Sequence, residues 1–403
     1  MKMTQVYDIV NSMTQQVLGD SAVVETDLSN IVDIGKATFD ATSTDNYVRK
    51  LVDHIGKVVF VDRPYAGRAP SLQMDGWEYG AVLEKIDCGI PEAETNPTWN
   101  LQNGQTYNQD VFNAPTDIVV KFFSDRVTFQ VPFSFADEQV KSAFSNATQL
   151  NAFFSMIYSK IEMSFTIKLD SLIMSTVDSL IAGTVYADYE GNAVGDSSHI
   201  RSINLLYLYN QKFGTNLTAD MCLTDLKFLE FAALNIKLAS NHLTMASTMF
   251  NVGGRVRHTP RSMQKIILLD QFAESSNVYL RSEVFHNEFV KLPEADIVSY
   301  WQGAGLAGFD FDDVTAIDVK IKNPIKSDTG DPDTVTVSMN GILGCIFDRD
   351  AAGVNCFKRR VTNHYNGLGE FTNFWYKMDA QYFNDFNENC IVFFVANPTP
   401  SDP

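Results

Sequence analysis

The stretch NATQLNAFFSMIYSKIEMSFTIKLDSLIMSTVDSLIA, residues 146–182, decides how the rest of the chain must be arranged. Its apolar residues recur at intervals of three and four, the spacing of one face of an α-helix. Asn146 is a suitable N-cap and Gly183 a suitable stop, so the pattern predicts one helix over residues 146–182. At 1.5 Å per residue this helix would be about 55 Å long, roughly twice the width of a small domain. Its apolar face therefore needs neighbours to cover it.

Strands are predicted before this helix. KVVFVD (57–62), AVLEKI (81–86), DIVVKFF (117–123) and RVTFQVPFSF (126–135) have strand composition, and the last alternates apolar with polar or small residues. A loop of about fifty residues, rich in Gly, Pro and Asn, interrupts them, which is unusual inside a compact domain. We therefore expect an extended hairpin that projects and packs against another subunit.

Helices and strands are also predicted after the long helix. A second helix is expected over residues 219–241, a strand–helix–strand unit over 264–301, and a meander of aromatic and β-branched strands from 334 to 396. The first 45 residues hold too little apolar surface for a core of their own, so we interpret them as an arm that becomes ordered on another surface. The sequence thus favours an α+β fold.

Composition limits the function. The 403 residues include 31 Lys and Arg against 49 Asp and Glu, a formal net charge of −18. Such a charge repels phosphates, which argues against tight, general nucleic-acid binding but suits a surface past which DNA moves. Five widely spaced cysteines without a C-x-x-C pair indicate a reduced, intracellular protein. We find neither a signal-peptide profile nor an apolar run long enough to cross a bilayer.

One glycine motif raises the alternative of a nucleotide site. Gly303-Ala-Gly305-Leu-Ala-Gly308 matches G-x-G-x-x-G after a predicted strand. The residues that follow it include Asp310, Asp312 and Asp313, which would repel a pyrophosphate. A Gly-rich loop is therefore the favoured interpretation.

Two acidic turns could offer oxygen ligands to a hard cation, but both lack the spaced bidentate Glu of an EF-hand. Turn formation explains them better. The six histidines are scattered, and neither a Walker loop nor a G-x-S-x-G elbow is present. The sequence predicts no catalytic, cofactor or metal site. The acidic turns contain Asp328, Asp331 and Asp333, and Asp188, Glu190 and Asn192.

Several basic and aromatic residues are candidates for contacts between subunits. The Lys358-Arg359-Arg360 cluster stands out in an acidic chain, and both a subunit contact and a solvent-facing strand explain it. DNA binding is disfavoured there, because three charges are few against the overall repulsion. The tryptophans of the projecting loop would be suitable anchors if a partner covers them. The candidates are Arg63, Arg68, Trp77, Trp99, Lys358, Arg359 and Arg360.

Two segments, and the order of the elements, carry a resemblance to a known family. LVDHIGKVVFVDRPYAG (51–67) resembles the entry to an extended loop, and GILGCIFDRDAAGV (341–354) with the following segment 356–395 resembles a set of closing strands. The order of arm, long hairpin, spine-length helix, α/β segment and aromatic strands is similar to that of tailed-bacteriophage major capsid proteins of the Hong Kong 97-type fold. The likeness is greatest to small podoviruses of Gram-positive bacteria.

The resemblance implies a division of the chain and a function. It places an N-terminal arm and short helix at 1–56, an extended loop at 57–134, a peripheral domain at 135–261 with the spine helix, an axial domain at 262–350, and return strands of the peripheral domain at 351–403. It implies a non-enzymatic protein that forms pentamers and hexamers of an icosahedral shell around double-stranded DNA, without sequence-specific binding. A separate scaffolding protein, a portal, assembly in the host bacterial cytoplasm and a place in the virion capsid are also implied.

Two alternatives remain open. An encapsulin-type nanocompartment shell has the same fold and encloses cargo enzymes instead of DNA. A soluble α/β nucleotide-binding enzyme would use the Gly303 loop. Long elements with unpaired edges are hazards in a monomer but are buried when copies overlap, which favours a shell protein over the enzyme.

Overall fold

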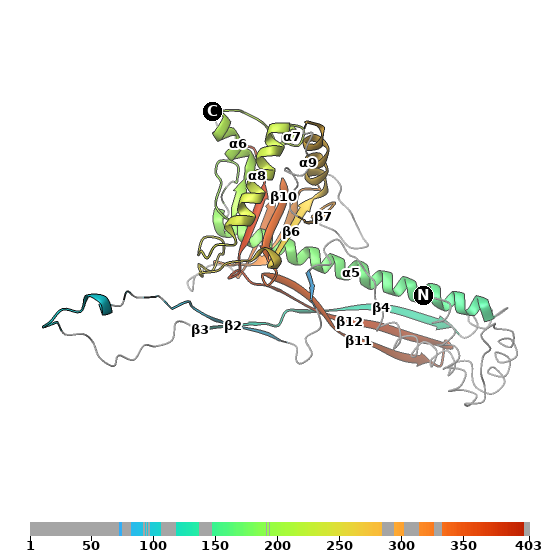
Figure 1. Ribbon diagram of the computed structural model, residues 1–403. Helices are drawn as coiled ribbons and strands as arrows, with labels where there is room; N and C mark the ends of the chain where they lie inside the picture. The colour runs from blue at the N-terminus through green and yellow to red at the C-terminus, as the bar shows by residue number, and fades with distance from the viewer. Residues whose placement is uncertain are drawn as a thin grey trace.

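The structure is a computed structural model that describes residues 72–74, 82–91, 93, 95, 97–105, 118–136, 147–190, 192, 194–283, 294–301, 314–325 and 333–398. One long helix, α5, joins a lobe of helices and strands to a long, narrow sheet (Figure 1). A two-stranded ribbon extends from this body on the opposite side from the free end of α5 (Figure 1). The lobe and the long sheet therefore both pack against α5.

Helix α5 spans Ala147–Tyr189, 43 residues, or about 65 Å. Its first part buries one stripe at every fourth position, including Ile157, Ile161 and Phe165. Its last part, residues 177–185, is buried on nearly all sides because it lies between elements of both larger sheets. The predicted stop at Gly183 is wrong: a Cβ there would lie 2.3 Å from Phe386 Cζ, so the glycine allows close packing inside the helix.

The long sheet has the strand order β1-β11-β12-β4. β11 (Ala352–Asn366) and β12 (Phe371–Asn384) form an antiparallel hairpin. The short β1 (Gln73–Met74) pairs parallel with β11. β4 (Arg126–Ala136) pairs antiparallel with β12 along the whole length of β4. The expectation that residues 126–135 return within the projecting hairpin is wrong. Three of their alternating side chains pack on the α5 core instead: Phe129, Val131 and Phe133.

The lobe is built on a five-stranded sheet, β5-β13-β10-β6-β7. Neighbouring residues on a strand face opposite ways, so the sheet contributes side chains to two hydrophobic clusters, one on each of its faces. On β10, Cys345 and Phe347 face α5, whereas Ile346 faces the helices of the lobe. The strands are β5 (Ser202–Asn204), β13 (Cys390–Phe394), β10 (Ile342–Asp348), β6 (Gln264–Leu269) and β7 (Asp296–Val298). The helices are α6 (Leu205–Phe213), α7 (Ala219–Cys222), α8 (Leu226–His242) and α9 (Asp270–Glu283).

The predicted helix over residues 219–241 is divided into α7 and α8. The Asp225 side chain accepts a hydrogen bond from the Phe228 backbone N–H at 2.8 Å, the N-cap interaction that starts α8. Leucines recur at helical spacing on both sides of the break between α7 and α8, so the sequence pattern gave no sign of the N-cap at Asp225. Helix α6 and strands β5, β8 (Ile317–Lys322) and β1 were not predicted.

A two-stranded sheet of β8 and β9 (Thr334–Met339) packs on α5. α6 and α8 cover the sheet that contains β6 and β10. The predicted boundary between residues 261 and 262 thus falls between α8 and the strands that it covers. Within the described ranges, no helix is long and apolar enough to span a membrane.

Candidate assembly interface

The projecting ribbon consists of β2 (Leu83–Cys88) and β3 (Ile118–Phe123), paired antiparallel. Side chains alternate between its two faces. On one face Ile86 lies opposite Val120, and Phe122 lies opposite Glu84; these four are exposed, and Phe122 is 65% exposed. We call Ile86, Cys88, Ile118, Val120 and Phe122 the apolar ribbon face.

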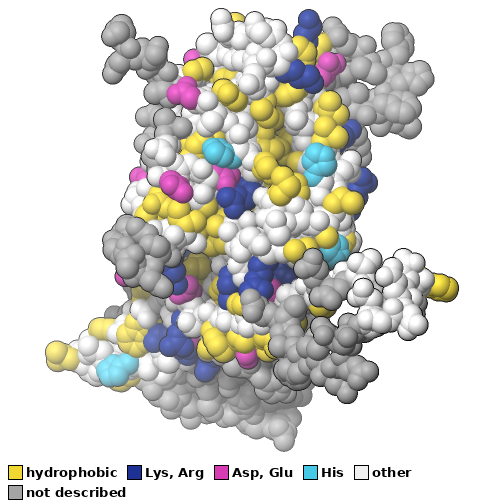
Figure 2. Space-filling view, turned by 90° about the vertical axis from the view of Figure 1, so that its left-hand side faces the viewer, with side chains coloured by type: hydrophobic (Ala, Val, Ile, Leu, Met, Phe, Trp, Pro, Cys, Tyr) yellow, Lys and Arg dark blue, Asp and Glu magenta, His cyan; other side chains and the backbone are white. Residues whose placement is uncertain are grey.

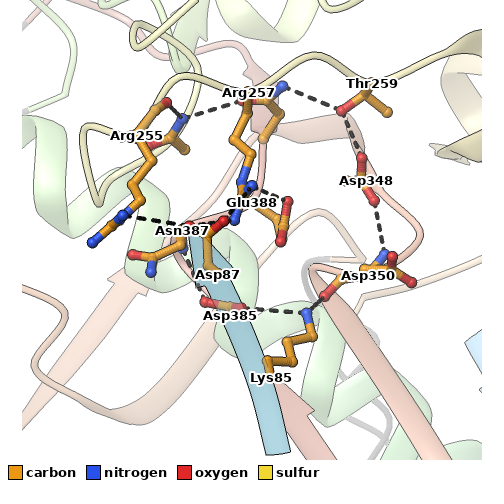
Figure 3. A network of polar contacts seen from close by, with 12 residues as sticks. Lys85, Asp87, Arg255, Arg257, Thr259, Asp348, Asp350, Asp385, Asn387 and Glu388 are labelled. Carbon is orange, nitrogen blue, oxygen red and sulfur yellow. Dashed lines mark hydrogen bonds and ion pairs between the residues drawn. The ribbon is translucent and has the colours of Figure 1, made fainter. Parts of the chain in front are cut away.

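The other ribbon face turns its charged residues toward the body. Lys85, Asp87 and Lys121 are half-buried, and Lys85 and Asp87 point to the loops at the end of the lobe (Figure 3). Phe123 on the same face packs against Phe383 of β12, with ring centroids 5.3 Å apart. The ribbon therefore has much of the reverse of the usual arrangement: three of its charged side chains face the body, and most of the side chains on its exposed face are apolar.

Asp385 is the main attachment point for the ribbon. Its two carboxylate oxygens accept from Lys85 Nζ at 3.3 Å and from Lys121 Nζ at 2.9 Å, so it holds one residue from each strand. The side chain is almost completely buried. Burial alone would raise the pKa of the Asp385 carboxyl, but Lys85, Lys121 and the Asn387 N–H together hold that pKa below its ordinary value. Asp385 therefore stays ionised.

A second set of ion pairs attaches β2 to the lobe. Asp87 contacts Arg257 at 2.9 Å and Arg255 at 3.5 Å, and Arg257 Nε lies 3.4 Å from Glu388 (Figure 3). Burial raises the pKa of Glu388, and the nearby Arg257 and Lys85 offset that effect only in part. Together with the Asp385 pairs, these contacts fix the direction in which the ribbon leaves the body.

The turn beneath the ribbon is held by its own polar contacts. Asp348 accepts from Thr259 Oγ1 at 2.7 Å and from the Asp350 N–H at 2.9 Å, and Lys85 donates to the Asp350 carbonyl. A cleft of about 960 Å³ lies between β2, the loop around Arg255 and this turn. Its lining mixes acidic and basic residues, which already pair with one another across it.

The contact candidates predicted from sequence fall into three groups. Trp99, on a single 3-10 turn (η2, Pro97–Asn100) beyond the ribbon strands, is 96% exposed. Lys358 is also exposed. The other candidates of the projecting loop lie outside the described residues: Arg63, Arg68 and Trp77.

The arginines of the basic cluster bind within their own chain. The Arg359 side chain is only 6% exposed; it pairs with Glu162 of α5 at 2.9 Å and lies over the Phe165 ring. Arg360 donates to Asp379 on β12, which also accepts from Thr128 of β4 at 2.7 Å. Arg359 joins α5 to β11, and Arg360 joins β11 to β12; the sequence could not show this because their partners are 197 and 19 positions away.

Of the predicted acidic turns, the one at Asp188, Glu190 and Asn192 lies within the described residues, and its side chains do not converge as a ligand set. Asp188 accepts from Arg201 Nε at 2.8 Å, and Glu190 and Asn192 are exposed. Gly303–Gly308, Asp328 and Asp331 lie outside the described residues. In the part of the chain that the structure describes, we find no cluster of three or more His, Cys, Asp or Glu side chains placed to hold a metal ion.

Sequence reasoning missed the residues that attach the ribbon. Lys85, Asp87 and Lys121 alternate with Ile86, Val120 and Phe122, and this pattern was visible as charged residues at every second position. It does not say which set faces the body. Their partners, Asp385 and Arg257, come about 170 to 300 residues later, so only the folded structure joins them.

Comparison with known proteins decides the family. A family model described as Phi29-like phage major capsid protein matches residues 8–394. The chain belongs to this family. Copies of such a protein build the phage capsid, so its role is structural and its place is the virion. The family match confirms the predicted capsid function, and neither the nanocompartment nor the enzyme is favoured.

Similarity to solved structures agrees in fold. A chain in the structure titled "Structure of head fiber and inner core protein gp22 of native bacteriophage P68" matches with a TM-score of 0.51 and 9% identity, over 83% of this chain and 86% of that chain. With the family match, it confirms the α+β, Hong Kong 97-type fold. Matches also include the capsid of Staphylococcus phage Andhra (TM-score 0.46, 13% identity, 83% and 86% covered) and that of Cyanophage P-SCSP1u (0.44, 11%, 83% and 90%). No curated protein matches.

Proposed function

We propose that the apolar ribbon face is a contact by which this subunit joins its neighbours in an icosahedral shell of pentamers and hexamers. The observation that supports the proposal is the reversed arrangement of the ribbon. Exposed Ile86, Val120 and Phe122 stand on a rigidly attached pair of strands, away from the body's own core. Leaving this surface in water costs about 25 cal/mol per Å² of apolar area, which a neighbouring copy recovers by covering it.

The direction of the ribbon suits contacts that close into rings. It leaves the body on one side, while the end of the long sheet and the start of α5 lie on the other (Figure 1). A contact between two different surfaces of identical subunits is heterologous, and such contacts form rings when the rotation closes. Many modest contacts per copy then add up to a stable particle.

The remaining expectations form one proposal for the particle. The shell encloses double-stranded DNA without reading its sequence, and the formal charge of −18 keeps the subunit from binding phosphates tightly. Assembly takes place in the host cytoplasm with a separate scaffolding protein and a portal, and the subunit is not an enzyme. The division into arm, extended loop, peripheral and axial domains is part of this proposal, with β4 assigned to the long sheet.

Among the predicted contact residues, Trp99 and Lys358 are exposed and suited to meet another copy. Trp99 is a large aromatic side chain, the type that dominates binding energy when a partner covers it. We retain Arg63, Arg68 and Trp77 as proposed contacts from the sequence. Arg359 and Arg360 serve mainly within the subunit, because their charges are already paired there.

Negative-stain electron microscopy with two variants of one residue tests the proposal. Phe122→Ser removes the most exposed ring of the ribbon strands, and Phe122→Leu keeps the site apolar. We expect the wild-type protein, with a scaffold where one is needed, and the Leu variant to form particles. The Ser variant should remain as folded, unassembled subunits by circular dichroism and sedimentation. Equal particle yields for Ser and wild type would contradict the role of this face, and failure of the wild type under all conditions would contradict the shell.

A further inference from the structure

The long sheet has a second face, on the side away from α5. β12 directs Phe374, Tyr376 and Met378 toward α5, so the residues between them turn to the opposite side. Residues that pair across strands share a face, and the register extends this side over β11 and β4. We call it the distal sheet face. Its central part consists of Lys358 and Arg360 of β11, Lys377, Asp379 and Gln381 of β12, and Arg126, Thr128 and Gln130 of β4.

Along the described strands, this face carries four basic side chains and one carboxylate. The carboxylate is Asp379, which already accepts from Arg360 and from Thr128 Oγ1. The other three basic side chains have no ion pair within the part of the chain that the structure describes. The face is therefore locally positive, in a chain whose formal net charge is −18. The three unpaired cations are Arg126, Lys358 and Lys377.

The register also sets like charges against each other. Arg360 of β11 lies directly opposite Lys377 of β12, which places their Cβ atoms about 5 Å apart. Lys358 follows about 7 Å along β11, in the next row on the same side. Like charges placed directly opposite destabilise a sheet, and Asp379 offsets only part of this repulsion. An anion bound over these rows would remove the rest.

Nearby acidic residues do not neutralise the face. Asp125, which precedes β4, is paired with Lys322 of β8 at 2.6 Å. Glu370 lies in the turn of the hairpin, about 24 Å along β12 from Lys377. The two acidic residues that follow β4 in the sequence lie outside the described residues. The cations thus remain available to an anion from outside the subunit.

The surroundings of the cations indicate which kind of anion fits. None of the large hydrophobic side chains exposed in the described ranges lies on the distal sheet face, in contrast to the apolar ribbon face. A protein partner gains most of its binding energy from such anchors. Phosphate backbones are instead held by Lys and Arg together with Thr and Gln side chains, and exposed Thr128 and Gln130 lie beside the cations.

Figure 2 shows how the charges are distributed over one side of the molecule. Lys and Arg side chains gather in the lower half of the view. Because this view is turned about the vertical axis of Figure 1, the lower half corresponds to the level of the ribbon and the long sheet. Positive charge is therefore concentrated below the lobe, at the level of the distal sheet face.

We propose that the distal sheet face holds the phosphate backbone of double-stranded DNA, in a weak, sequence-independent contact on the inner side of the shell. The inference rests on the proposed function and deepens it, because it names the face that turns toward the DNA. The sequence counted three charges at residues 358–360; the fold turns Arg359 to the other face and adds Lys377 and Arg126. A few cations per subunit, in an acidic chain, keep each contact weak.

Binding of a labelled DNA duplex to the unassembled subunit, followed by fluorescence anisotropy, measures the contact. Three unpaired cations predict a slope of about −2.7 for the logarithm of affinity against the logarithm of salt, or about a 40-fold loss from 50 to 200 mM. Duplexes of different sequence should bind equally well. A slope near zero, or a strong sequence preference, would overturn the proposal.

Charge reversals locate the contact. Lys358→Glu and Lys377→Glu act on the distal sheet face, whereas Lys160→Glu is the matched control, because Lys160 is exposed on α5. We expect each sheet variant to lower the affinity for the duplex about tenfold and the control to change it less than about twofold. Lys377→Glu should not lower the melting temperature, since it replaces a like-charged pair with an opposite one. Equal losses from all three variants would overturn the assignment to this face.

Formaldehyde cross-linking of DNA-filled particles, read by peptide mass spectrometry, tests the orientation. We expect the peptide that contains Lys358 to be linked to DNA and the peptide that contains Lys160 to remain free. Links at Lys160 without links at Lys358 would overturn the proposal. So would a Lys358→Glu variant that loses particle yield but keeps its affinity for DNA, because that result assigns the face to a protein partner. Failure of the wild type to form particles would contradict the shell itself, whereas unchanged DNA binding in variants that assemble contradicts only this contact.

Discussion

The β2–β3 ribbon and the β11–β12 hairpin are both long antiparallel pairs, yet they treat their hydrophobic residues in opposite ways. β12 directs Phe374, Tyr376 and Met378 into the core beneath α5 and has β4 as a further neighbour. The ribbon directs Ile86 and Phe122 to solvent, and among the described residues it has no third strand. The same local pattern thus serves folding in one region and, under the proposed function, association in the other. What distinguishes them is which face finds a partner within the chain.

The largest effect is expected in the β11–β12 region. Phe374 is fully buried, so Phe374→Ala should lower the free energy of unfolding of the subunit by about 3–5 kcal/mol through lost burial and a residual cavity. Phe374→Leu should cost clearly less, because it fills much of the site. Urea unfolding followed by circular dichroism measures both. A loss of less than about 1 kcal/mol for the Ala variant would contradict a core that depends on this hairpin.

A smaller effect is expected where the ribbon meets the body. Asp385→Asn leaves Lys85 and Lys121 without their negative partner, which should cost about 1–3 kcal/mol and make the ribbon more sensitive to limited proteolysis. Asp125→Asn is the matched control: its pair with Lys322 is well exposed, so a change below about 0.5 kcal/mol is expected. If the two variants are cleaved at the same rate, Asp385 does not hold the ribbon.

The contributions of the Asp385 and Glu388 carboxyls to the stability of the fold should change with pH in opposite directions. The folded-state pKa of Asp385 is lowered, so its stabilisation is present above the unfolded-state pKa and is lost as pH falls through the lower, folded value. The folded-state pKa of Glu388 is raised, so its protonation on acidification stabilises the fold, and this gain is lost as pH rises through the folded value.

Thermal unfolding across the acidic range checks these signs. The wild type should lose stability at the acidic end, and the Asp385→Asn variant should lose less over the same range. Glu388→Gln should remove the gain that accompanies mild acidification. An Asp385→Asn profile parallel to the wild type down to the lowest pH would contradict the assignment.

The smallest effect on the subunit is expected on the apolar ribbon face. Val120→Ser should change the free energy of unfolding by less than about 0.5 kcal/mol, since the side chain is already exposed. Val354→Ser on β11, which removes a buried valine and introduces a hydroxyl, should cost several times more. Similar losses from both would mean that the ribbon face is packed within the subunit.

The sequence could predict elements whose pattern is local. The 3.6-residue period located α5 and the alternation located β4, because each depends on residues a few positions apart. It could not predict that α5 continues through Gly183, because Phe386 creates the need for a glycine there. Nor could it assign β4 to β12, or Lys85 and Lys121 to Asp385, since these pairings join distant parts of the chain. The contact candidates were chosen by residue type, which gave exposed Trp99 but also Arg359, whose partner is Glu162 of the same chain.

Alkylation of Cys88 tests whether neighbouring copies cover the ribbon. Cys88 is exposed on the apolar ribbon face opposite Ile118, whereas burial raises the pKa of the Cys222 and Cys390 thiols to about 12 and keeps them unreactive. We expect Cys88 to react quickly with a thiol reagent in the unassembled subunit and much more slowly in the assembled particle. Equal reaction rates in the two states would show that the ribbon's hydrophobic face stays open, and that other surfaces hold the shell together.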